Sequence, residues 1–229
     1  MSSSVMEDYL KAIFTLEETE EPPIPPSRIA ERLDVTTPTV TSMMETLEGE
    51  GLVDREKYAG VTLTEEGETV ALEILRHHRL IEAFLAEHLD YEWSEVHDEA
   101  EVLEHHISED FERRVAQRLD HPSTDPHGDP IPGTDLEPID DDTSPLSAFE
   151  TGDRVDVCRV RDEDPEILDH LADIGIEPGT TVEITAITPL DVYEVAVGDS
   201  TRHLPQETAD AVRVREHPDG EAENGTVEA

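Results

Sequence analysis

The stretch SRIAERLDVTTPTVTSMMETLEGEGLVDREKYAGVTL, residues 27–63, predicts two short helices followed by a β-hairpin. The first helix should cover residues 27–33, with Ser27 as its cap. The second should begin near residues 36–38, where threonines precede a proline, and run to Glu48, after which glycines end it. The hairpin follows as two alternating apolar runs. This order of elements is typical of a winged helix-turn-helix, a DNA-binding fold.

The first turn of the second helix is free of carboxylates, although 58 of the 229 residues are acidic. Its hydroxyl groups can bond phosphates or base edges, and its methyl groups can pack on thymine. We therefore expect this turn to enter the major groove, with the DNA backbone held by the hairpin and by the first helix, which also carries Arg32. The predicted DNA-binding residues are Ser27, Arg28, Thr36, Thr37, Pro38, Thr39, Thr41, Ser42, Arg55, Lys57 and Tyr58. The alternatives are a helical hairpin within a bundle, or a winged fold that contacts proteins.

The rest of the chain predicts further helices and then a change to strands. An amphipathic helix over residues 6–16 should end at the prolines that follow, and long helices are expected over 65–88 and 94–119. A last part with strand periodicity indicates a small barrel-like β domain containing one helix, which Gly175 ends. The predicted organisation is a winged helix-turn-helix domain at 1–64, a helical domain at 65–120, a linker at 121–145, a β-barrel domain at 146–217 and a disordered acidic tail at 218–229. The fold class is thus mainly α with a β module.

The composition is strongly acidic, with 58 acidic and 16 basic residues and a net charge of -42. Charges at this density repel one another, and molar salt removes most of that penalty by reducing the Debye length to about 3 Å. We therefore expect a protein of a salt-rich cytoplasm, as in a halophilic archaeon. A disordered acidic chain is excluded for most of the length by the regular apolar patterning.

Cysteine content and hydropathy point to a cytoplasmic protein. A single cysteine, Cys158, rules out an intrachain disulfide framework, and its alternation with valines predicts a buried structural thiol. No apolar run reaches the roughly 20 residues that span a bilayer, and the N-terminus does not have the pattern of a signal peptide. We expect no association with membranes.

Six potential metal-binding side chains occur at helical spacing in the middle of the chain. Offsets of four, seven and eight residues return to nearly the same side of an α-helix, so two adjacent helices can direct nitrogen and carboxylate donors at one point. The candidates are His78, Glu82, His97, Glu101, Glu104 and His105. Each alone is more often a solvated or paired side chain, and the prediction depends on their convergence. Nearby histidines that fall off the pattern, and are expected to be surface or packing residues, are His77, His88 and His106.

Several ordered motifs together resemble the diphtheria toxin repressor family of metal-dependent transcriptional regulators. The motifs are MEDYLKAIF, PTVTSMMETLEGEGLV, HHRLIEAFL, VHDEAEVLEHHIS and GDPIPG, within residues 5–133. The C-terminal β domain is similar to the FeoA-type, Src-homology-like module of longer family members. The resemblance implies a winged helix, a helical dimerisation and metal-binding domain, and a homodimer that binds palindromic operators in double-stranded DNA when loaded with Mn(II) or Fe(II).

The resemblance also implies two metal sites. The family's ancillary site falls on His78, Glu82 and His97, and its primary site falls on Asp8, Glu101, Glu104 and His105. Carboxylates at positions 8 and 101 match the manganese-responsive branch, whereas the iron-responsive branch usually has Met and Cys there. Hard carboxylate oxygens suit Mn(II). A second N-terminal acid of the manganese pattern corresponds here to Lys11, which puts a two-manganese cluster in doubt.

These features predict a regulator, most simply a repressor, that senses Mn(II) and controls metal-uptake genes, with an Fe(II)-responsive regulator of iron homeostasis as the alternative. An enzyme is not expected, because the chain lacks HExxH, a nucleophile elbow and a phosphate loop. Two alternatives of other classes are a metallohydrolase, which would leave the winged helix unexplained, and a metal-transport accessory protein, which would not need the N-terminal half.

Overall fold

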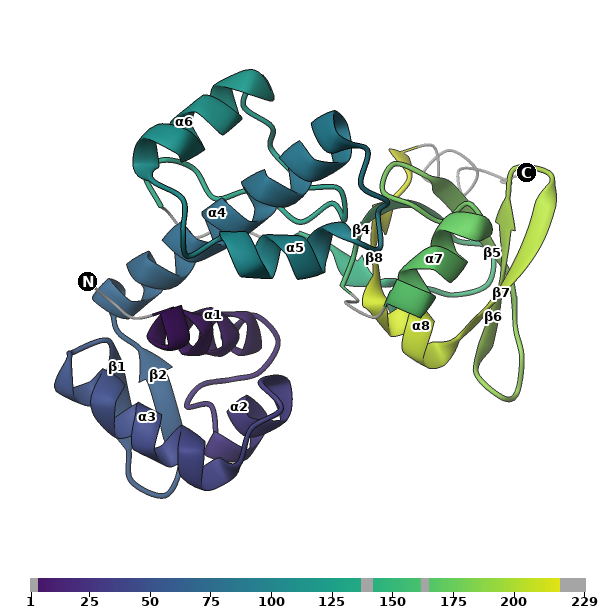
Figure 1. The fold of residues 1–229 in the computed structure, drawn as a ribbon. Coiled ribbons are helices and arrows are strands. Elements are labelled where there is room, and N and C mark those ends of the chain that lie inside the picture. The colour runs from purple at the N-terminus through teal and green to yellow at the C-terminus, as the bar shows by residue number, and fades with distance from the viewer. Residues whose placement is uncertain (1–3, 137–141, 162–164, 219–229) are drawn as a thin grey trace, which may run out of the picture. The chain divides into compact units, whose positions relative to one another are not determined.

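The computed structural model describes residues 4–136, 142–161 and 165–218 (Figure 1). The predicted acidic tail beyond residue 218 and residues 137–141 of the predicted linker lie outside the described residues. The chain divides into two compact units. Of the described residues, the first unit comprises 4–81, 100–120 and 131–136, and the second comprises 82–99, 121–130, 142–161 and 165–218.

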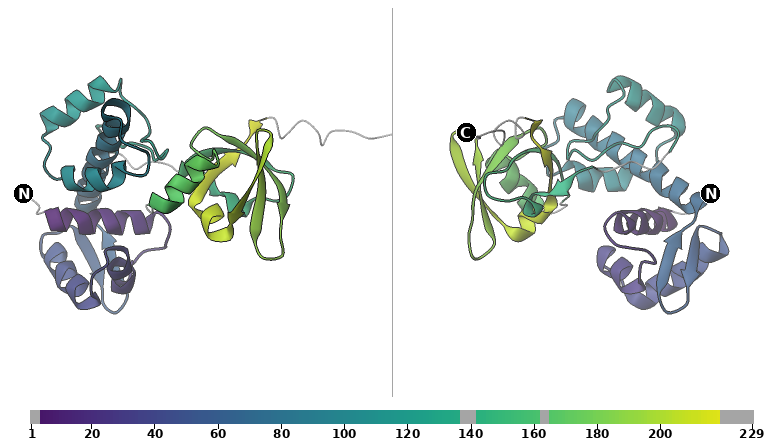
Figure 2. Two further views of the ribbon diagram at one scale, coloured as in Figure 1. Left: turned by 45° about the vertical axis from the view of Figure 1, so that its right-hand side comes forward. Right: turned by 180° about the vertical axis from the view of Figure 1, so that it is seen from behind.

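The first unit begins with the predicted winged helix-turn-helix. Its elements are α1 (Ser4–Glu17), α2 (Pro26–Arg32), α3 (Thr37–Gly49), β1 (Val53–Glu56) and β2 (Gly60–Leu63). Helix α1 packs against α2 and β2, while α3 packs against α2 and β1 (Figure 2). A buried core that includes Leu10, Ile13, Ile29, Val40 and Leu47 joins these elements.

The two helix starts differ in how well the sequence predicts them. Thr36 is the N-cap of α3, and its hydroxyl accepts a hydrogen bond from the backbone N–H of Thr39, as expected. The prediction that Ser27 caps α2 is wrong, because the N-cap is Pro25 and Ser27 lies inside the helix. Pro26 occupies the first turn instead, where the fixed φ of proline suits a helix start.

A third segment pairs with the two strands of the wing, and the sequence did not predict this pairing. Strands β1 and β2 pair antiparallel with Val53 opposite Leu63 and Glu56 opposite Gly60. Ile24, in the proline-rich segment before α2, exchanges backbone hydrogen bonds of 2.7 and 3.0 Å with Val61 of β2. This bridge fixes the segment between α1 and α2 against the wing.

Replacing Gly60 by alanine should destabilise the DNA-binding domain by about 2 to 3 kcal/mol, because an added Cβ would lie 2.1 Å from the carbonyl oxygen of Ile24. Denaturant unfolding in molar KCl measures this effect. Gly49→Ala is the matched control: a Cβ at Gly49 meets nothing within 4 Å, so that variant should be unchanged or up to about 1 kcal/mol more stable. Equal stability of the two variants would contradict the packing described here.

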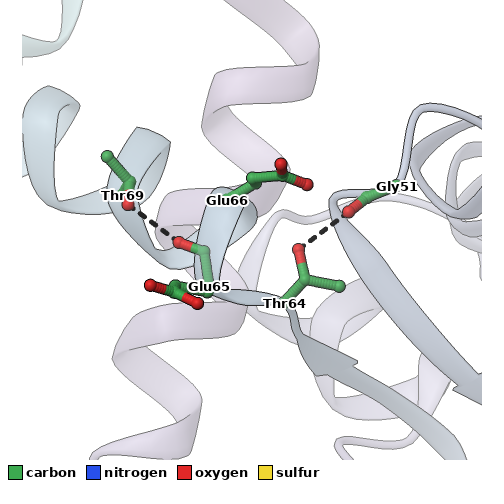
Figure 3. A pocket seen from close by; sticks show the side chains of 5 residues that line it. All are labelled: Gly51, Thr64, Glu65, Glu66 and Thr69. Atoms are coloured by element: carbon green, nitrogen blue, oxygen red, sulfur yellow. Dashed lines mark hydrogen bonds between the residues drawn. The ribbon is translucent and has the colours of Figure 1, made fainter.

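Helix α4 (Glu65–Leu89) follows the wing directly. Thr64 accepts a hydrogen bond from the backbone N–H of Gly67 at 3.1 Å and donates one to the carbonyl of Gly51 at 2.8 Å. Figure 3 shows the contact between Thr64 and Gly51 in a surface pocket, which Glu65, Glu66 and Thr69 also line. The side chain of Thr64 therefore caps α4 and links the start of this helix to Gly51, which follows α3.

The prediction of one continuous helix over residues 94–119 is wrong. Two helices, α5 (Val96–Leu103) and α6 (Glu109–Arg118), are separated by a turn that contains Glu104 and His105. Ser108 starts α6 by accepting a hydrogen bond from the backbone N–H of Phe111, and three acidic residues follow in the first turn. Two candidate metal ligands thus lie in a turn rather than on a helix face.

The second unit contains the predicted β module. Its sheet has six antiparallel strands in the order β3-β8-β4-β5-β6-β7, and β6 and β7 form a hairpin (Figure 2). The strands are β3 (Ser144–Pro145), β4 (Arg154–Val160), β5 (Thr181–Ile187), β6 (Val192–Val197), β7 (Ser200–Pro205) and β8 (Val212–Glu216). The helical elements are η1 (Leu146–Ala148), α7 (Pro165–Asp173) and α8 (Gln206–Ala211). Four of these elements, β3, η1, α8 and β8, were not predicted from the sequence.

Helix α7 ends as predicted, since Gly175 follows it with φ of +75°. A buried core that includes Leu146, Val157, Leu168, Ile184 and Val214 holds α7 to the sheet. Part of the predicted linker is packed in this unit, because Asp125 and His127 are both buried. Among the described residues, no helix combines the length and apolar character needed to cross a bilayer.

Candidate metal centre and DNA-reading surface

Three of the predicted metal ligands converge in the first unit. Asp8 comes from α1, whereas Glu104 and His105 come from the turn after α5. One ligand atom of each lies within 4.8 Å of the others. The Nε2 atom of His105 is 2.8 Å from Asp8 Oδ1 and 3.3 Å from Glu104 Oε1. The break between α5 and α6 therefore presents adjacent residues 104 and 105 to a single point on α1.

Glu7 orients His105 and was not predicted. Its Oε2 atom lies 2.7 Å from His105 Nδ1, on the opposite side of the ring from Asp8. If Nδ1–H donates to Glu7, the lone pair of Nε2 faces Asp8 and Glu104. A carboxylate behind a ligating histidine fixes the tautomer and raises the basicity of the ring. The only sequence signal is the position of Glu7 beside Asp8, which an acidic chain makes easy to overlook.

The two carboxylates of this group differ in their surroundings. Burial raises the pKa of Glu104, but hydrogen bonds from His78 and Lys11 outweigh burial and bring that pKa below its usual value. Burial also raises the pKa of Asp8, and His105 and Lys11 offset it only in part. Glu104 is therefore held ionised inside the protein, where its side chain is completely shielded from solvent.

Lys11 places a fixed positive charge beside the group of three. Its Nζ atom is 2.5 Å from Glu101 Oε1 and 2.7 Å from Glu104 Oε1. Burial lowers the pKa of Lys11, but the charges of Glu104 and Glu101 outweigh burial and raise it, so the ammonium group stays protonated. Glu101, the fourth predicted primary ligand, thus contacts Lys11 and lies outside the group formed by Asp8, Glu104 and His105.

The predicted ancillary residues occupy both units. His78, on α4, lies in the first unit, where its Nδ1 atom is 2.5 Å from Glu104 Oε2. Glu82, one turn later on α4, and His97, on α5, lie in the second unit, where Oε1 of Glu82 is 3.4 Å from Nδ1 of His97. The off-pattern His77 is a buried packing residue whose Nδ1 lies 3.2 Å from the backbone carbonyl of Glu104.

The group in the first unit fits a divalent cation on chemical grounds. Two carboxylates and one imidazole are the donors that Mn(II), Fe(II) and Zn(II) share in proteins. The donors are already positioned by partners outside the group, namely Glu7 for His105 and His78 for Glu104. Preorganised donors of this kind can bind a cation with little rearrangement of the surrounding side chains.

Glu7→Gln should weaken Mn(II) binding about 10-fold, because a neutral amide replaces the charge-assisted hydrogen bond to His105. Calorimetric titration with Mn(II) in molar KCl measures the affinity. Glu21→Gln, at an exposed position, is the control that removes the same charge elsewhere. Identical affinities in the two variants would show that Glu7 does not orient a ligand.

The first turn of α3 is exposed as a DNA-reading element requires. Thr36, Thr37, Pro38, Thr39 and Ser42 are exposed and Thr41 is half-buried, while Val40 points into the core. The hydroxyl of Thr41 donates to the carbonyl of Thr37 at 3.0 Å. The turn therefore offers hydroxyl and methyl groups to a ligand without any nearby carboxylate of its own.

The two arginines that we predict to contact the DNA backbone form ion pairs with acidic residues of the protein. Arg28 bonds Glu20 and Glu31, and Arg55 lies 3.6 Å from Glu45 and 3.2 Å from Glu48. Exposed pairs of this kind contribute little to stability, so these arginines can exchange a carboxylate for a phosphate.

At the tip of the wing, Lys57 lies 5.0 Å from the ring centroid of Tyr58. Tyr58 is 96% exposed and has φ of +68°, so its ring is presented to solvent. Ser27 of α2 is exposed as well.

Sequence models of known protein families match three successive parts of the chain. Residues 1–61 match the N-terminal DNA binding domain of iron dependent repressors, and residues 64–133 match their metal binding and dimerisation domain. Residues 144–216 match the FeoA domain.

Individual proteins match over nearly the whole chain. The iron-dependent repressor IdeR of Mycobacterium tuberculosis is 37% identical over 220 residues, which cover 91% of this chain and 95% of that protein. The diphtheria toxin repressor of Corynebacterium glutamicum is 34% identical over 218 residues, covering 91% and 94%. Among solved structures, a manganese-dependent transcriptional repressor in complex with manganese has a TM-score of 0.87 and 38% identity, covering 93% of this chain and 100% of that one. The manganese regulator SloR has a TM-score of 0.78 and 31% identity, covering 93% and 98%.

Proposed function

Because the chain belongs to the diphtheria toxin repressor family of metal-dependent transcriptional repressors, we propose that it represses metal-uptake genes when Mn(II) is bound by Asp8, Glu104 and His105. Family membership makes it a DNA-binding regulator that dimerises through its helical domain, and not an enzyme. A metallohydrolase and a metal-transport accessory protein are therefore set aside.

The convergence of α1 with the turn after α5 carries this proposal. Asp8 belongs to the DNA-binding helices, and His105 belongs to the helical segment that follows α4, yet their side chains are 2.8 Å apart. A bound divalent cation supplies positive charge that holds the carboxylates of Asp8 and Glu104 together with the His105 ring. These residues then fix α1, and with it α3, relative to the dimerisation segment. Metal binding and DNA binding are thereby linked, and each strengthens the other.

We propose Glu101 and the ancillary residue His78 as supporting members of the metal centre in the first unit, and the other ancillary residues, Glu82 and His97, as a separate pair of donors within the second unit. Glu101 can join the primary group when Lys11 releases its carboxylate, because Lys11 links Glu101 to Glu104 of that group. His78 already contacts Glu104, so it is positioned to hold that carboxylate toward Asp8 and His105.

Donor chemistry favours Mn(II). The group contains hard carboxylate oxygens and no thiolate or thioether, a donor set that suits Mn(II) over softer metals. Fe(II) is the second candidate, since relatives of this length and identity include iron-dependent repressors. The ammonium group of Lys11 fills the space beside Glu104 and would repel a second cation there. This arrangement favours one bound ion over a two-manganese cluster.

The dimer implies a palindromic operator. Two copies of α3 related by twofold symmetry would contact half-sites separated by about 34 Å, one helical turn of DNA, or a multiple of it. The exposed hydroxyl and methyl groups at residues 36–42 would face the base edges. Arg28, Arg55 and Lys57 would exchange their present partners for phosphates.

Operator affinity is expected to hold or to rise as KCl increases from low to molar concentrations. The net charge of -42 opposes approach to DNA at low ionic strength, and screening removes that repulsion. Fluorescence anisotropy with a labelled duplex measures the affinity across the series. A steep monotonic loss, as for a protein that binds through many Lys and Arg contacts, would refute salt adaptation.

A DNA-binding titration in molar KCl with Mn(II), Fe(II), Zn(II) or a chelator tests the proposal. The duplex can be obtained by repeated selection from random DNA in the presence of Mn(II). We expect tight binding with Mn(II), weaker binding with Fe(II), and loss of binding with the chelator. Chelator-resistant binding of the selected duplex would contradict a metal-dependent repressor of this design.

A further inference from the structure

Arg28, which we predict to hold the DNA backbone, already binds two carboxylates of its own domain. It lies in the first turn of α2, and Glu20 comes from the segment between α1 and α2. Its Nε atom is 2.8 Å and its Nη2 atom 2.7 Å from the same oxygen, Oε1 of Glu20. Glu31, three residues later on α2, bonds Nη1. The donors that would bind a phosphate are therefore occupied by glutamates.

Arg55, in β1, has two acidic neighbours on α3. Its Nη1 atom lies 3.2 Å from Oε2 of Glu48 and 3.6 Å from Oε1 of Glu45. Glu45 and Glu48 are three residues apart, so their side chains lie on one side of the helix. Their exposed fractions are 65% and 49%, so both carboxylates stay in contact with water while they attract Arg55.

The carboxylates of this surface lie beside the arginines and are absent from the turn expected to read the bases. Residues 35–44 contain no acidic residue, although 58 of the 229 residues of the chain are acidic. Glu45 follows this stretch directly and faces Arg55. The acidic residues thus occur where phosphate contacts are expected and spare the base contacts.

A carboxylate and a phosphate are interchangeable acceptors for a guanidinium group. Both carry negative charge and offer oxygens that match the N–H fork of arginine. Exposed pairs between arginine and glutamate contribute little to stability, so a phosphate can displace the glutamate without much loss.

The exchange changes how the contact depends on salt. An unpaired arginine that binds a phosphate releases about 0.9 of a cation from DNA, and this release lowers affinity as salt increases. A paired arginine also frees a glutamate, and the freed carboxylate of a strongly acidic protein attracts a cation from solution. Release at the DNA and uptake at the protein offset each other, so the contact becomes nearly independent of salt concentration.

We propose that the glutamates beside the two arginines are internal substitutes for DNA phosphates, which give way to phosphates on binding and then take up cations. The residues are Glu20 and Glu31 for Arg28, and Glu45 and Glu48 for Arg55. These glutamates make DNA binding tolerant of molar salt. The proposal rests on the proposed function only in taking DNA as the ligand of this surface. The competing account is uniform screening of the net charge of -42, in which every exposed carboxylate of the domain counts equally.

The slope of log affinity against log KCl concentration distinguishes the two accounts. Fluorescence anisotropy with the selected duplex and saturating Mn(II) gives this slope. The double variant Glu20→Gln and Glu31→Gln leaves Arg28 without these partners. Its slope should be more negative than that of the wild type by about 0.9, which is roughly an additional 8-fold loss of affinity over a 10-fold increase in salt.

The double variant Glu45→Gln and Glu48→Gln should steepen the slope by a similar amount, because it removes both carboxylates beside Arg55. The matched control is Glu21→Gln with Glu50→Gln, which removes the same charge from exposed positions of the same domain. The control should keep the wild-type slope. Equal slopes in the control and in both test variants would overturn the proposal.

Arg28→Gln tests the exchange at the arginine itself. In the wild type it should weaken binding a few-fold and leave the slope unchanged, because the contact that it removes is nearly independent of salt. Added to Glu20→Gln and Glu31→Gln, it should restore the wild-type slope. A steeper slope that persists after Arg28→Gln would also overturn the proposal. Circular dichroism checks that each variant is folded, and the Mn(II) dependence of the wild type at one KCl concentration tests the proposed function separately.

Discussion

Replacing His105 by alanine is expected to abolish metal-dependent DNA binding while the fold is retained. The Nε2 atom of His105 lies between Asp8 and Glu104, so the variant loses the nitrogen donor that joins α1 to the turn after α5. Removing a partner behind a ligand already costs 10- to 100-fold in metal affinity, and removing the ligand itself should cost more than about 100-fold. Because DNA affinity is linked to metal affinity, operator binding at a fixed Mn(II) concentration should fall to the level seen with a chelator.

His106→Ala is the matched control, since His106 is in the same turn but is exposed and absent from the converging group. Fluorescence anisotropy with the selected duplex, at several Mn(II) concentrations, compares the two variants. Circular dichroism should show the same helical content for both. Mn(II)-dependent operator binding by His105→Ala at wild-type affinity would remove His105 from the mechanism.

Replacing Thr39 by glutamate should eliminate operator binding without loss of stability. Thr39 is exposed in the first turn of α3, three residues after the N-cap Thr36. Glutamate at this position can complete a capping box and interact favourably with the helix dipole, so α3 itself should be stabilised. The same carboxylate would face DNA phosphates, and like charges brought together at an interface cost several kcal/mol, which corresponds to more than about 100-fold in affinity.

Thr46→Glu provides the control on the same helix, because Thr46 is exposed but lies beyond the turn expected to meet the bases. It should change operator affinity by no more than a few-fold. Mn(II) affinity in the absence of DNA should equal that of the wild type in both variants. Wild-type operator binding by Thr39→Glu would mean that α3 does not read the DNA.

Local signals were sufficient where a short segment determines its own structure. The hydroxyl of Thr36 before Pro38 located the start of α3, and Gly175 located the end of the helix in the β module, because caps and left-handed glycines act over a few residues. The wing and the long α4 followed from apolar periodicity in the same way.

The boundary between α5 and α6 was not predicted, although the sequence contains a local signal for it. Residues 94–119 were predicted as one helix, although Ser108 followed by acidic residues is itself a helix-start signal. The break changes the metal centre: Glu104 and His105 converge on Asp8 from a turn, and helical spacing does not explain their positions.

Contacts between distant segments could not be inferred from the sequence. The bridge between Ile24 and Val61, the pairing of Lys11 with Glu101, and the contact of Glu7 with His105 each join residues that no short-range pattern relates. The loop that carries Asp125 and His127 is the clearest case. Its composition is that of a linker, and only packing against β4 shows that it is ordered and buried.

The most direct test of the account is the affinity of the protein for Mn(II), measured in molar KCl with and without a saturating amount of the selected operator duplex. If the cation held by Asp8, Glu104 and His105 controls how the dimer grips DNA, the duplex must raise Mn(II) affinity by the same factor by which Mn(II) raises DNA affinity, on the order of 10- to 100-fold. A Mn(II) affinity that does not change when the operator is bound would contradict the account.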